Sequence, residues 1–122
     1  MYNENIWRWY HDAGTQGAIE SPSFCAKSVN AACGDQVTIT GVTKNNIITN
    51  AKHQSSGCVI SGAAASFLVS YALGRSISEM QGLTLDDVLA AMNLQLGPAR
   101  RECIAVALKA FQDALAADTG VL

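Results

Sequence analysis

Apolar and polar positions alternate with a period of two in the stretch DQVTITGV, residues 35–42. Val37 and Ile39 alternate with threonines, which is typical of a strand with one buried face. Two further β-branched runs, FCAKSV before it and NNIITNAKHQ after it, predict two more strands. TKNN predicts a hairpin turn between the last two strands, and NAAC is a candidate for the first turn. We therefore expect three antiparallel strands within residues 24–56.

The pattern becomes helical after Gly57, because Ile60, Ala64, Phe67 and Leu68 recur at the spacing of one helix face. Ser55 and Ser56 are the candidate caps of this helix, and Gly74 is its candidate end. SISEMQGL and TLDDVLAAMN predict two short helices, the second with capping-box-like spacing at its start.

LGPARRECIAVALKAFQDALAAD predicts a long final helix, with Pro98 in its first turn and Ile104, Leu108 and Phe111 along one face. NENIWRWYHD, at the other end of the chain, predicts a short helix with Ile6, Trp7 and Tyr10 on one side. Because the strands are followed by helices, we expect an α+β fold. We expect one domain, residues 1–122, in which helices pack on one face of a three-stranded antiparallel sheet.

Composition narrows the classes of partner. The formal net charge is −2 and charged residues make up 15% of the chain, so the sequence lacks the basic surface that binds nucleic acid or anionic membranes. The most apolar segment, VISGAAASFLVSYALG, is too short to cross a bilayer comfortably and predicts a buried helix. MYNENIWRWYHD does not have the pattern of a secretory signal, so we expect a cytoplasmic protein.

Four cysteines are the candidate chemistry: Cys25, Cys33, Cys58 and Cys103. In a reducing cytosol they are metal ligands, reactive thiols or buried core residues more often than disulfides. Cys58 is expected at a helix N-terminus, which lowers a thiol's pKa and favours the thiolate that binds metals. Asp35 should share a strand face with Cys33, so sulfur and carboxylate can converge on one ion, of zinc or iron. The spacing alone leaves the choice between a metal site and scattered buried thiols open.

ACGDQVTI, SSGCVISGAAASFLVSYALGRSISEM and LGPARRECIAVALKA together resemble the IscU/NifU-type iron-sulfur cluster assembly scaffold family. The three cysteine contexts occur in the order of that family, with 25 residues from Cys33 to Cys58 and 45 from Cys58 to Cys103. The resemblance implies that Cys33, Asp35, Cys58 and Cys103 hold the cluster or metal, and that Cys103 is a candidate sulfur acceptor. It covers nearly the whole chain.

Two segments depart from the family pattern. Where scaffolds of the family carry L-P-P-V-K, read by an Hsp70-type chaperone, this chain has LGPAR, with Gly97 and Ala99 at the changed positions. Recognition by such a chaperone is therefore left open. Glu102 replaces the histidine before the third cysteine and is a possible additional oxygen ligand. The SufU branch, which binds zinc, also lacks that histidine but has an insertion between the second and third cysteines, for which the spacing here leaves no room.

The remaining candidates have plainer interpretations. Cys25 is expected to be a buried structural thiol, and His11 a surface residue. His53, five residues before Cys58, is a weaker candidate for a place near the site. The aromatic residues of the first helix are expected to pack onto the sheet rather than to form a docking surface for a desulfurase.

The resemblance implies a scaffold and not an enzyme. Such a protein receives sulfur from a cysteine desulfurase, binds iron, assembles a transient 2Fe-2S cluster and transfers it to acceptor apo-proteins. A zinc-binding sulfur acceptor of the SufU kind is the alternative, because the same ligands would hold zinc. A third possibility is a structural homologue that binds no cluster.

Overall fold

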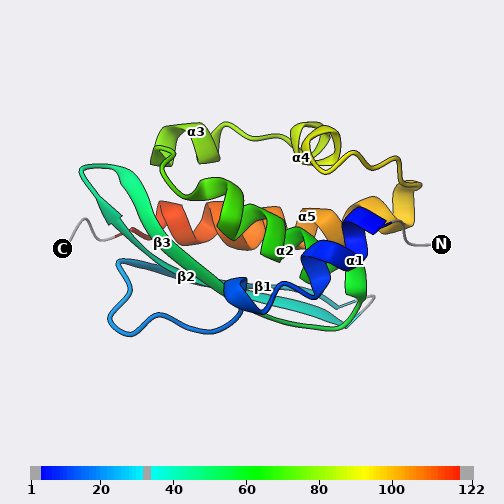
Figure 1. Ribbon diagram of the computed structural model, residues 1–122, viewed down its shortest axis with the longest axis horizontal. Helices are drawn as coiled ribbons and strands as arrows, with labels where there is room; N and C mark the ends of the chain where they lie inside the picture. Colours follow the sequence, from blue (N-terminus) through cyan, green and yellow to red (C-terminus); the bar gives the residue numbers. More distant parts are fainter. Residues whose placement is uncertain (1–3, 32–33, 119–122) are drawn as a thin grey trace.

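The structure is a computed structural model that describes residues 4–31 and 34–118. A three-stranded antiparallel sheet carries helices on one face, as predicted (Figure 1). The elements in chain order are α1 (Glu4–Tyr10), the 3-10 helix η1 (Ala13–Thr15), β1 (Phe24–Asn30), β2 (Asp35–Lys44), β3 (Ile47–Ser56), α2 (Val59–Ala72), α3 (Ile77–Gln81), α4 (Leu85–Ala91) and α5 (Pro98–Ala116).

The register of the sheet brings the chemistry-bearing residues to one end. The strand order is β1-β2-β3, with Asn30 opposite Asp35 in the first pair and Gln36 opposite Ser56 in the second. At the other end of the β2–β3 hairpin, Asn45 and Asn46 both have positive φ, 53° and 65°, as a tight two-residue hairpin turn requires. The predicted TKNN turn is thus confirmed, and the chain leaves β3 for α2 close to Asp35.

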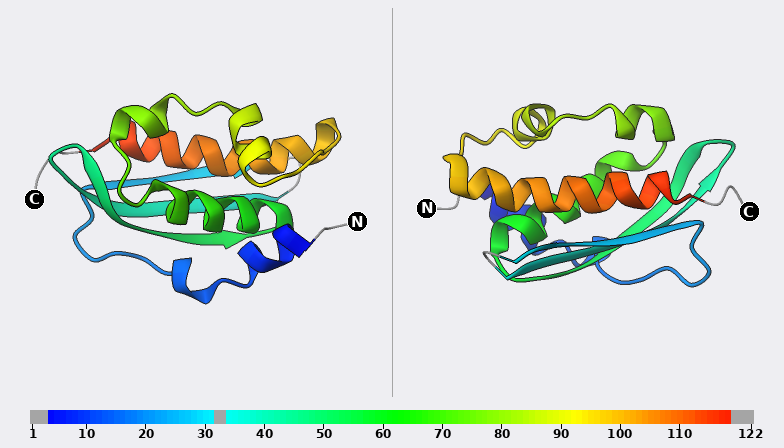
Figure 2. Two further views of the ribbon diagram at one scale, coloured as in Figure 1. Left: turned by 45° about the horizontal axis from the view of Figure 1, so that its top comes forward. Right: turned by 180° about the vertical axis from the view of Figure 1, so that it is seen from behind.

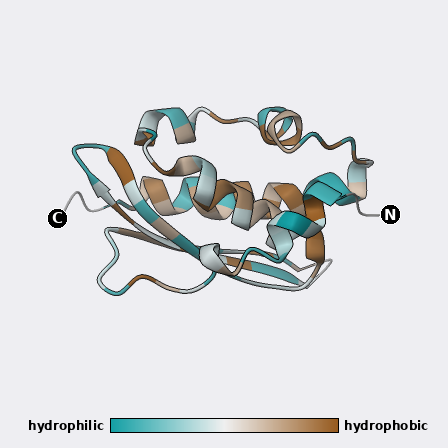
Figure 3. Cartoon of the chain, viewed as in Figure 1, coloured by the Kyte–Doolittle hydropathy of each residue, from teal (hydrophilic) through white to brown (hydrophobic). Residues whose placement is uncertain are grey.

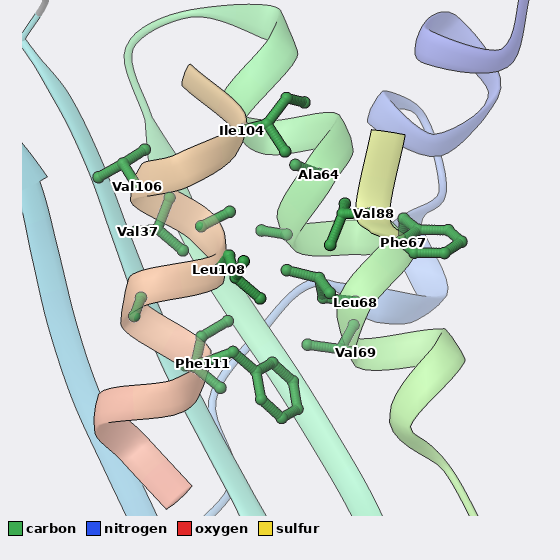
Figure 4. Packing of buried hydrophobic residues seen from close by; sticks show 14 of the residues in the cluster. Val37, Ala64, Phe67, Leu68, Val69, Val88, Ile104, Val106, Leu108 and Phe111 are labelled. Carbon is green, nitrogen blue, oxygen red and sulfur yellow. The ribbon is translucent and has the colours of Figure 1, made fainter. Parts of the chain in front are cut away.

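The helices form two layers above the sheet. α2 and α5 lie on the sheet, and α3 and α4 lie beyond them on the far side (Figures 1 and 2). Ile104, Leu108 and Phe111 of α5 point into the core that it shares with α2 (Figure 4), which confirms the predicted face of the last helix. Ser76 and Thr84 begin α3 and α4 with capping boxes, to Glu79 and Asp87 respectively.

α2 is buried on almost every side. Eleven of its 14 residues are buried, and its ribbon is mostly white to brown on the hydropathy scale (Figure 3). A helix that is apolar all round belongs in the core of a protein or in a membrane. Here the helix is covered by the sheet, α5 and α1, so the predicted buried helix is confirmed. Among the described residues, no helix is both long enough and apolar enough to cross a membrane.

The first helix differs from the prediction. Ile6 is buried in the core, and Trp9 packs against that core, where its ring meets Phe67 of α2 edge to face at 5.5 Å. Residues three apart share a helix face, which explains why Trp9 joins Ile6 and Trp7 does not. Trp7 and Tyr10 remain 41% and 37% exposed. The expected face was therefore wrong for Trp7, whereas Tyr10 lies on the side of Ile6 with its ring next to Gly62. The aromatic packing is against α2 instead of the sheet.

A buried hydrogen-bond network ties η1 to β3 and α2. His53 is 4% exposed, its Nδ1 lies 2.8 Å from the Ser55 hydroxyl and its Nε2 lies 3.2 Å from the Thr15 hydroxyl. The Thr15 hydroxyl also lies 2.8 Å from that of Ser66. Burial lowers the pKa of His53 to about 4, although the nearby Asp12 acts in the opposite direction. The network is therefore built around a neutral imidazole.

Acid should destabilise the fold through this histidine. The pKa of His53 is about 4 in the fold and 6.5 in the unfolded chain, so the unfolded chain binds more protons in between. The contribution of the neutral His53 to the unfolding free energy is complete above about pH 6.5 and is lost as the pH falls toward 4. We expect wild type to lose about 2 kcal/mol more unfolding free energy between pH 7 and 4.5 than His53→Gln does. Urea denaturation at several pH values measures this. The exposed His11 offers the control, and equal acid dependence of His53→Gln and His11→Gln would contradict the expectation.

Candidate metal centre

Three of the predicted ligands come together at one end of the sheet. Asp35 is the first residue of β2, Cys58 is the N-cap of α2, and Cys103 lies in the second turn of α5. One ligand atom of each, a carboxylate oxygen or a sulfur, lies within 4.8 Å of the other two. Asp35 and Cys103 are buried, whereas Cys58 is half-buried. Cys33, the fourth predicted ligand, lies outside the described residues.

Gly57 makes this convergence possible. Its φ of +110° turns the chain from β3 into α2, and L side chains rarely adopt that conformation. A Cβ on Gly57 would lie 2.6 Å from Oδ1 and 2.8 Å from Cα of Asp35, so only glycine can pass this close. The next residue, Cys58, donates its backbone N–H to Asp35 Oδ1 at 2.8 Å. Strand and helix are thereby joined at the site itself.

Cys58 is the N-cap residue of α2, and its side chain caps the helix. Its Sγ accepts the backbone N–H of Ser61 at 3.4 Å, in the way that a serine or aspartate oxygen does at other helix starts. The prediction that Ser55 or Ser56 caps α2 was wrong, because both residues extend β3. A sulfur in this position faces the positive end of the α2 dipole, where negative charge is favoured.

The donor set fits a metal ion that accepts thiolate and carboxylate ligands. Asp35 is fully buried, yet its Oδ2 has no hydrogen-bond partner among the described residues. An unsatisfied buried oxygen of this kind costs about 1–3 kcal/mol, which a bound cation would offset. Burial raises the pKa of the Cys103 thiol, and Cys58 and Asp35 beside it raise it further. Binding a metal would therefore release a proton from Cys103. Zinc and iron both accept this mixed set of sulfur and oxygen.

Glu102 lies outside this group. Its side chain is exposed and lines a separate groove of about 230 Å³ between β1 and α5, together with Val29 and Lys109. Consecutive helix residues point about 100° apart, so Cys103 faces the core while Glu102 faces this groove.

The other candidates also lie away from the metal centre. Cys25 is exposed, so the prediction of a buried thiol was wrong. The reason is strand alternation, because Phe24 and Ser28 face the helices and Cys25 therefore points to the opposite face. His11 is on the surface, as predicted, and stacks on Trp7. His53 belongs to the network with Thr15 and Ser55.

Sequence reasoning missed two residues of the centre, Gly57 and Ser61. A glycine between a predicted strand and a cysteine that starts a helix was the available signal for the first. A serine three residues after that cysteine was the signal for the second, because this is the spacing of a residue whose N–H the cap accepts.

Several curated proteins are similar to this chain over almost its full length. The IscU scaffold protein of Thermotoga maritima is 25% identical over 94% of this chain and 92% of its own. The zinc-dependent sulfurtransferase SufU of Bacillus subtilis is 26% identical over 98% and 92%. The iron-sulfur cluster assembly enzyme IscU of Drosophila melanogaster is 30% identical over 95% and 77%.

Solved structures share the fold. FiSufU from Fervidobacterium islandicum AW-1 superposes with a TM-score of 0.80 at 22% identity, covering 93% of this chain and 96% of its own. The N-terminal part of a NifU-like protein from Brucella abortus gives 0.77 at 16% identity, covering 95% and 92%. The family model of the NifU-like N terminal domain matches residues 1–119. Together with the metal centre between β2, α2 and α5, these matches show that the chain belongs to the IscU/NifU-type scaffold family.

Proposed function

We propose that this protein is a scaffold on which an iron-sulfur cluster is assembled and from which it is released. The observation that carries the proposal is the convergence of Asp35, Cys58 and Cys103 around a buried carboxylate oxygen that has no hydrogen-bond partner within residues 4–31 and 34–118. The cluster, of the 2Fe-2S kind, is the cargo of the site. Its sulfur would come from a cysteine desulfurase and its destination would be acceptor apo-proteins.

The ligands suit a cargo that must leave. A carboxylate is a harder and more exchangeable ligand for iron than a thiolate, so Asp35 can let go while the cysteines still hold. Cys58 is the more exposed of the two described thiols in the group, and it gives incoming sulfur and iron a point of access. Neither histidine of the sequence lies beside them to serve as a general base. We therefore propose binding and transfer, without turnover by the protein itself as an enzyme.

A zinc-dependent sulfur acceptor is the second candidate. The similarity to SufU of Bacillus subtilis over 98% of this chain favours it, and so does the absence of a histidine ligand before Cys103. The same three residues would hold zinc, and a thiol would leave the metal to accept sulfur. The spacing of 45 residues between Cys58 and Cys103 supports the scaffold instead, because the SufU branch has an insertion there.

We do not extend the proposal to an Hsp70-type chaperone. The segment that such a chaperone would read lies at the start of α5, where Gly97 is the N-cap and Pro98 the first helical residue. It is exposed, but Gly97 and Ala99 replace the proline and valine of the family pattern.

Reconstitution tests the proposal directly. Wild-type protein, purified without oxygen and supplied with ferrous iron, cysteine, a cysteine desulfurase and dithiothreitol as the reductant of persulfide sulfur to sulfide, should develop the visible absorption of a 2Fe-2S cluster and pass it to an apo-ferredoxin. Cys58→Ser should lose most of the cluster, because a thiolate ligand is removed. Cys25→Ser is the matched control and should behave as wild type, since Cys25 is exposed on β1.

The alternatives give different outcomes. A protein that retains one zinc, resists exchange by iron and accepts persulfide sulfur would support the SufU-like function. A protein that binds neither metal would refute the scaffold function and point to a homologue without a cluster. Equal cluster content in the Cys58→Ser and Cys25→Ser variants would have the same meaning.

A further inference from the structure

Ser61 is a fully buried side chain in contact with a ligand of the metal centre. It is 0% exposed and lies one turn into α2, three residues after Cys58. Its hydroxyl donates to the backbone carbonyl of Cys58 at 3.0 Å, and its Oγ lies 3.7 Å from Cys58 Sγ. The hydroxyl therefore has two possible acceptors on the same residue, the carbonyl oxygen and the sulfur.

Coordination of the Cys58 sulfur to a metal decides which acceptor is the better one. In the metal-free protein the Cys58 thiol can donate its proton to Ser61 Oγ, while the Ser61 hydroxyl donates to the carbonyl. A metal-bound sulfur has lost that proton and carries negative charge, so it can only accept. Hydrogen bonds to charged acceptors are about twice as strong as neutral ones, which favours rotation of the hydroxyl toward the sulfur.

That rotation leaves no buried group without a partner. The Cys58 carbonyl also accepts the backbone N–H of Gly62, at 3.4 Å, as the first bond of the helix. The sulfur already accepts the backbone N–H of Ser61. After rotation the sulfur has two donors from one residue, and the carbonyl keeps one.

We propose that Ser61 is a positioning residue that exchanges its hydrogen bond from the Cys58 carbonyl to the Cys58 sulfur when that sulfur binds metal. This inference rests on the proposed function, because it concerns the same ligand. Its consequence is that the hydroxyl fixes the orientation of Cys58 and withdraws electron density from its sulfur, and both properties govern how firmly cargo is held.

Cobalt(II) binding tests the role of Ser61 without any transfer assay. The sulfur-to-cobalt charge-transfer band of wild type should shift in Ser61→Ala, because a hydrogen bond to the ligand sulfur is lost. Zinc should be extracted by a chelator about tenfold faster from Ser61→Ala than from wild type. Ser66→Ala is the matched control, since Ser66 is equally buried on α2 but bonds to Thr15, and it should leave both readouts unchanged.

The outcomes separate this inference from the function on which it rests. If wild type and Ser61→Ala share one band position and one extraction rate while Cys58→Ser binds no metal, Ser61 has no such role and the metal centre stands. If wild type binds no cobalt or zinc, the proposed function fails first. Should Ser61→Ala unfold, Ser61→Thr keeps a hydroxyl at the same place. A Ser61→Thr band at the wild-type position then supports the role, and a displaced one overturns it.

Discussion

Replacing Gly57 with alanine should both unfold a large fraction of the protein and abolish metal retention. The φ of +110° is strained for any residue with a Cβ, at a cost of about 1–3 kcal/mol. The added Cβ would also lie 2.8 Å from the Cα of Asp35, which forces the strand and the helix start apart. Overpacking of this kind costs about 1–3 kcal/mol more. We expect a total loss of about 2–6 kcal/mol, measured by urea denaturation of the metal-free protein.

Gly74 provides a control that isolates strain from contact. Its φ is +83°, and a Cβ there would meet nothing within 4 Å. Gly74→Ala should therefore cost only the strain, about 1–3 kcal/mol, and should leave metal retention intact. If Gly57→Ala and Gly74→Ala lost the same unfolding free energy and bound the same amount of zinc, the close passage over Asp35 would have no energetic significance.

The order and type of the elements could be predicted because each has a local signal. Alternation at Val37 and Ile39 marked the central strand, and Pro98 marked the start of α5. The first helix was misread because seven residues make only two turns, so several faces fit the pattern equally well. Cys25 was misread for a different reason. Its face of the strand depends on which side of the sheet the helices cover, and no single strand contains that information.

The metal centre could be predicted only in part for the same reason. The resemblance supplied Asp35, Cys58 and Cys103, and the structure brings them together. The resemblance could not show which contacts stabilise a buried carboxylate beside two thiols. That depends on the N–H of Cys58 and on the close passage of Gly57, which are contacts between strand and helix. The capping of α2 by Cys58 could not be predicted from the sequence either, because Ser55 and Ser56 nearby are more usual N-cap residues.

Asp35→Asn should lower metal affinity and raise the stability of the metal-free fold. An asparagine Oδ1 can still accept the Cys58 N–H, which Asp35 Oδ1 now accepts at 2.8 Å. The second oxygen, which is buried and has no partner in the part of the chain that the structure describes, is replaced by an amide nitrogen that can donate to a neighbouring sulfur. Relief of the unsatisfied oxygen should raise the unfolding free energy of the metal-free protein by about 1 kcal/mol.

The same substitution should weaken zinc binding by about 100-fold or more. An amide nitrogen does not coordinate zinc, and the amide oxygen that remains is neutral, hence a weaker ligand than a carboxylate, and already accepts the Cys58 N–H. Removing a residue that only hydrogen-bonds to a metal ligand already lowers metal affinity by about 10-fold to 100-fold. Removing a ligand itself should therefore lower the affinity by at least about 100-fold. Chelator competition measures the affinity, and urea denaturation with and without zinc measures the stability. Asp86→Asn is the control, because that carboxylate is exposed and pairs with Arg101 at the surface. A metal-free Asp35→Asn protein less stable than wild type, with zinc affinity unchanged, would mean that Asp35 serves the fold alone and that its free oxygen is not reserved for a metal.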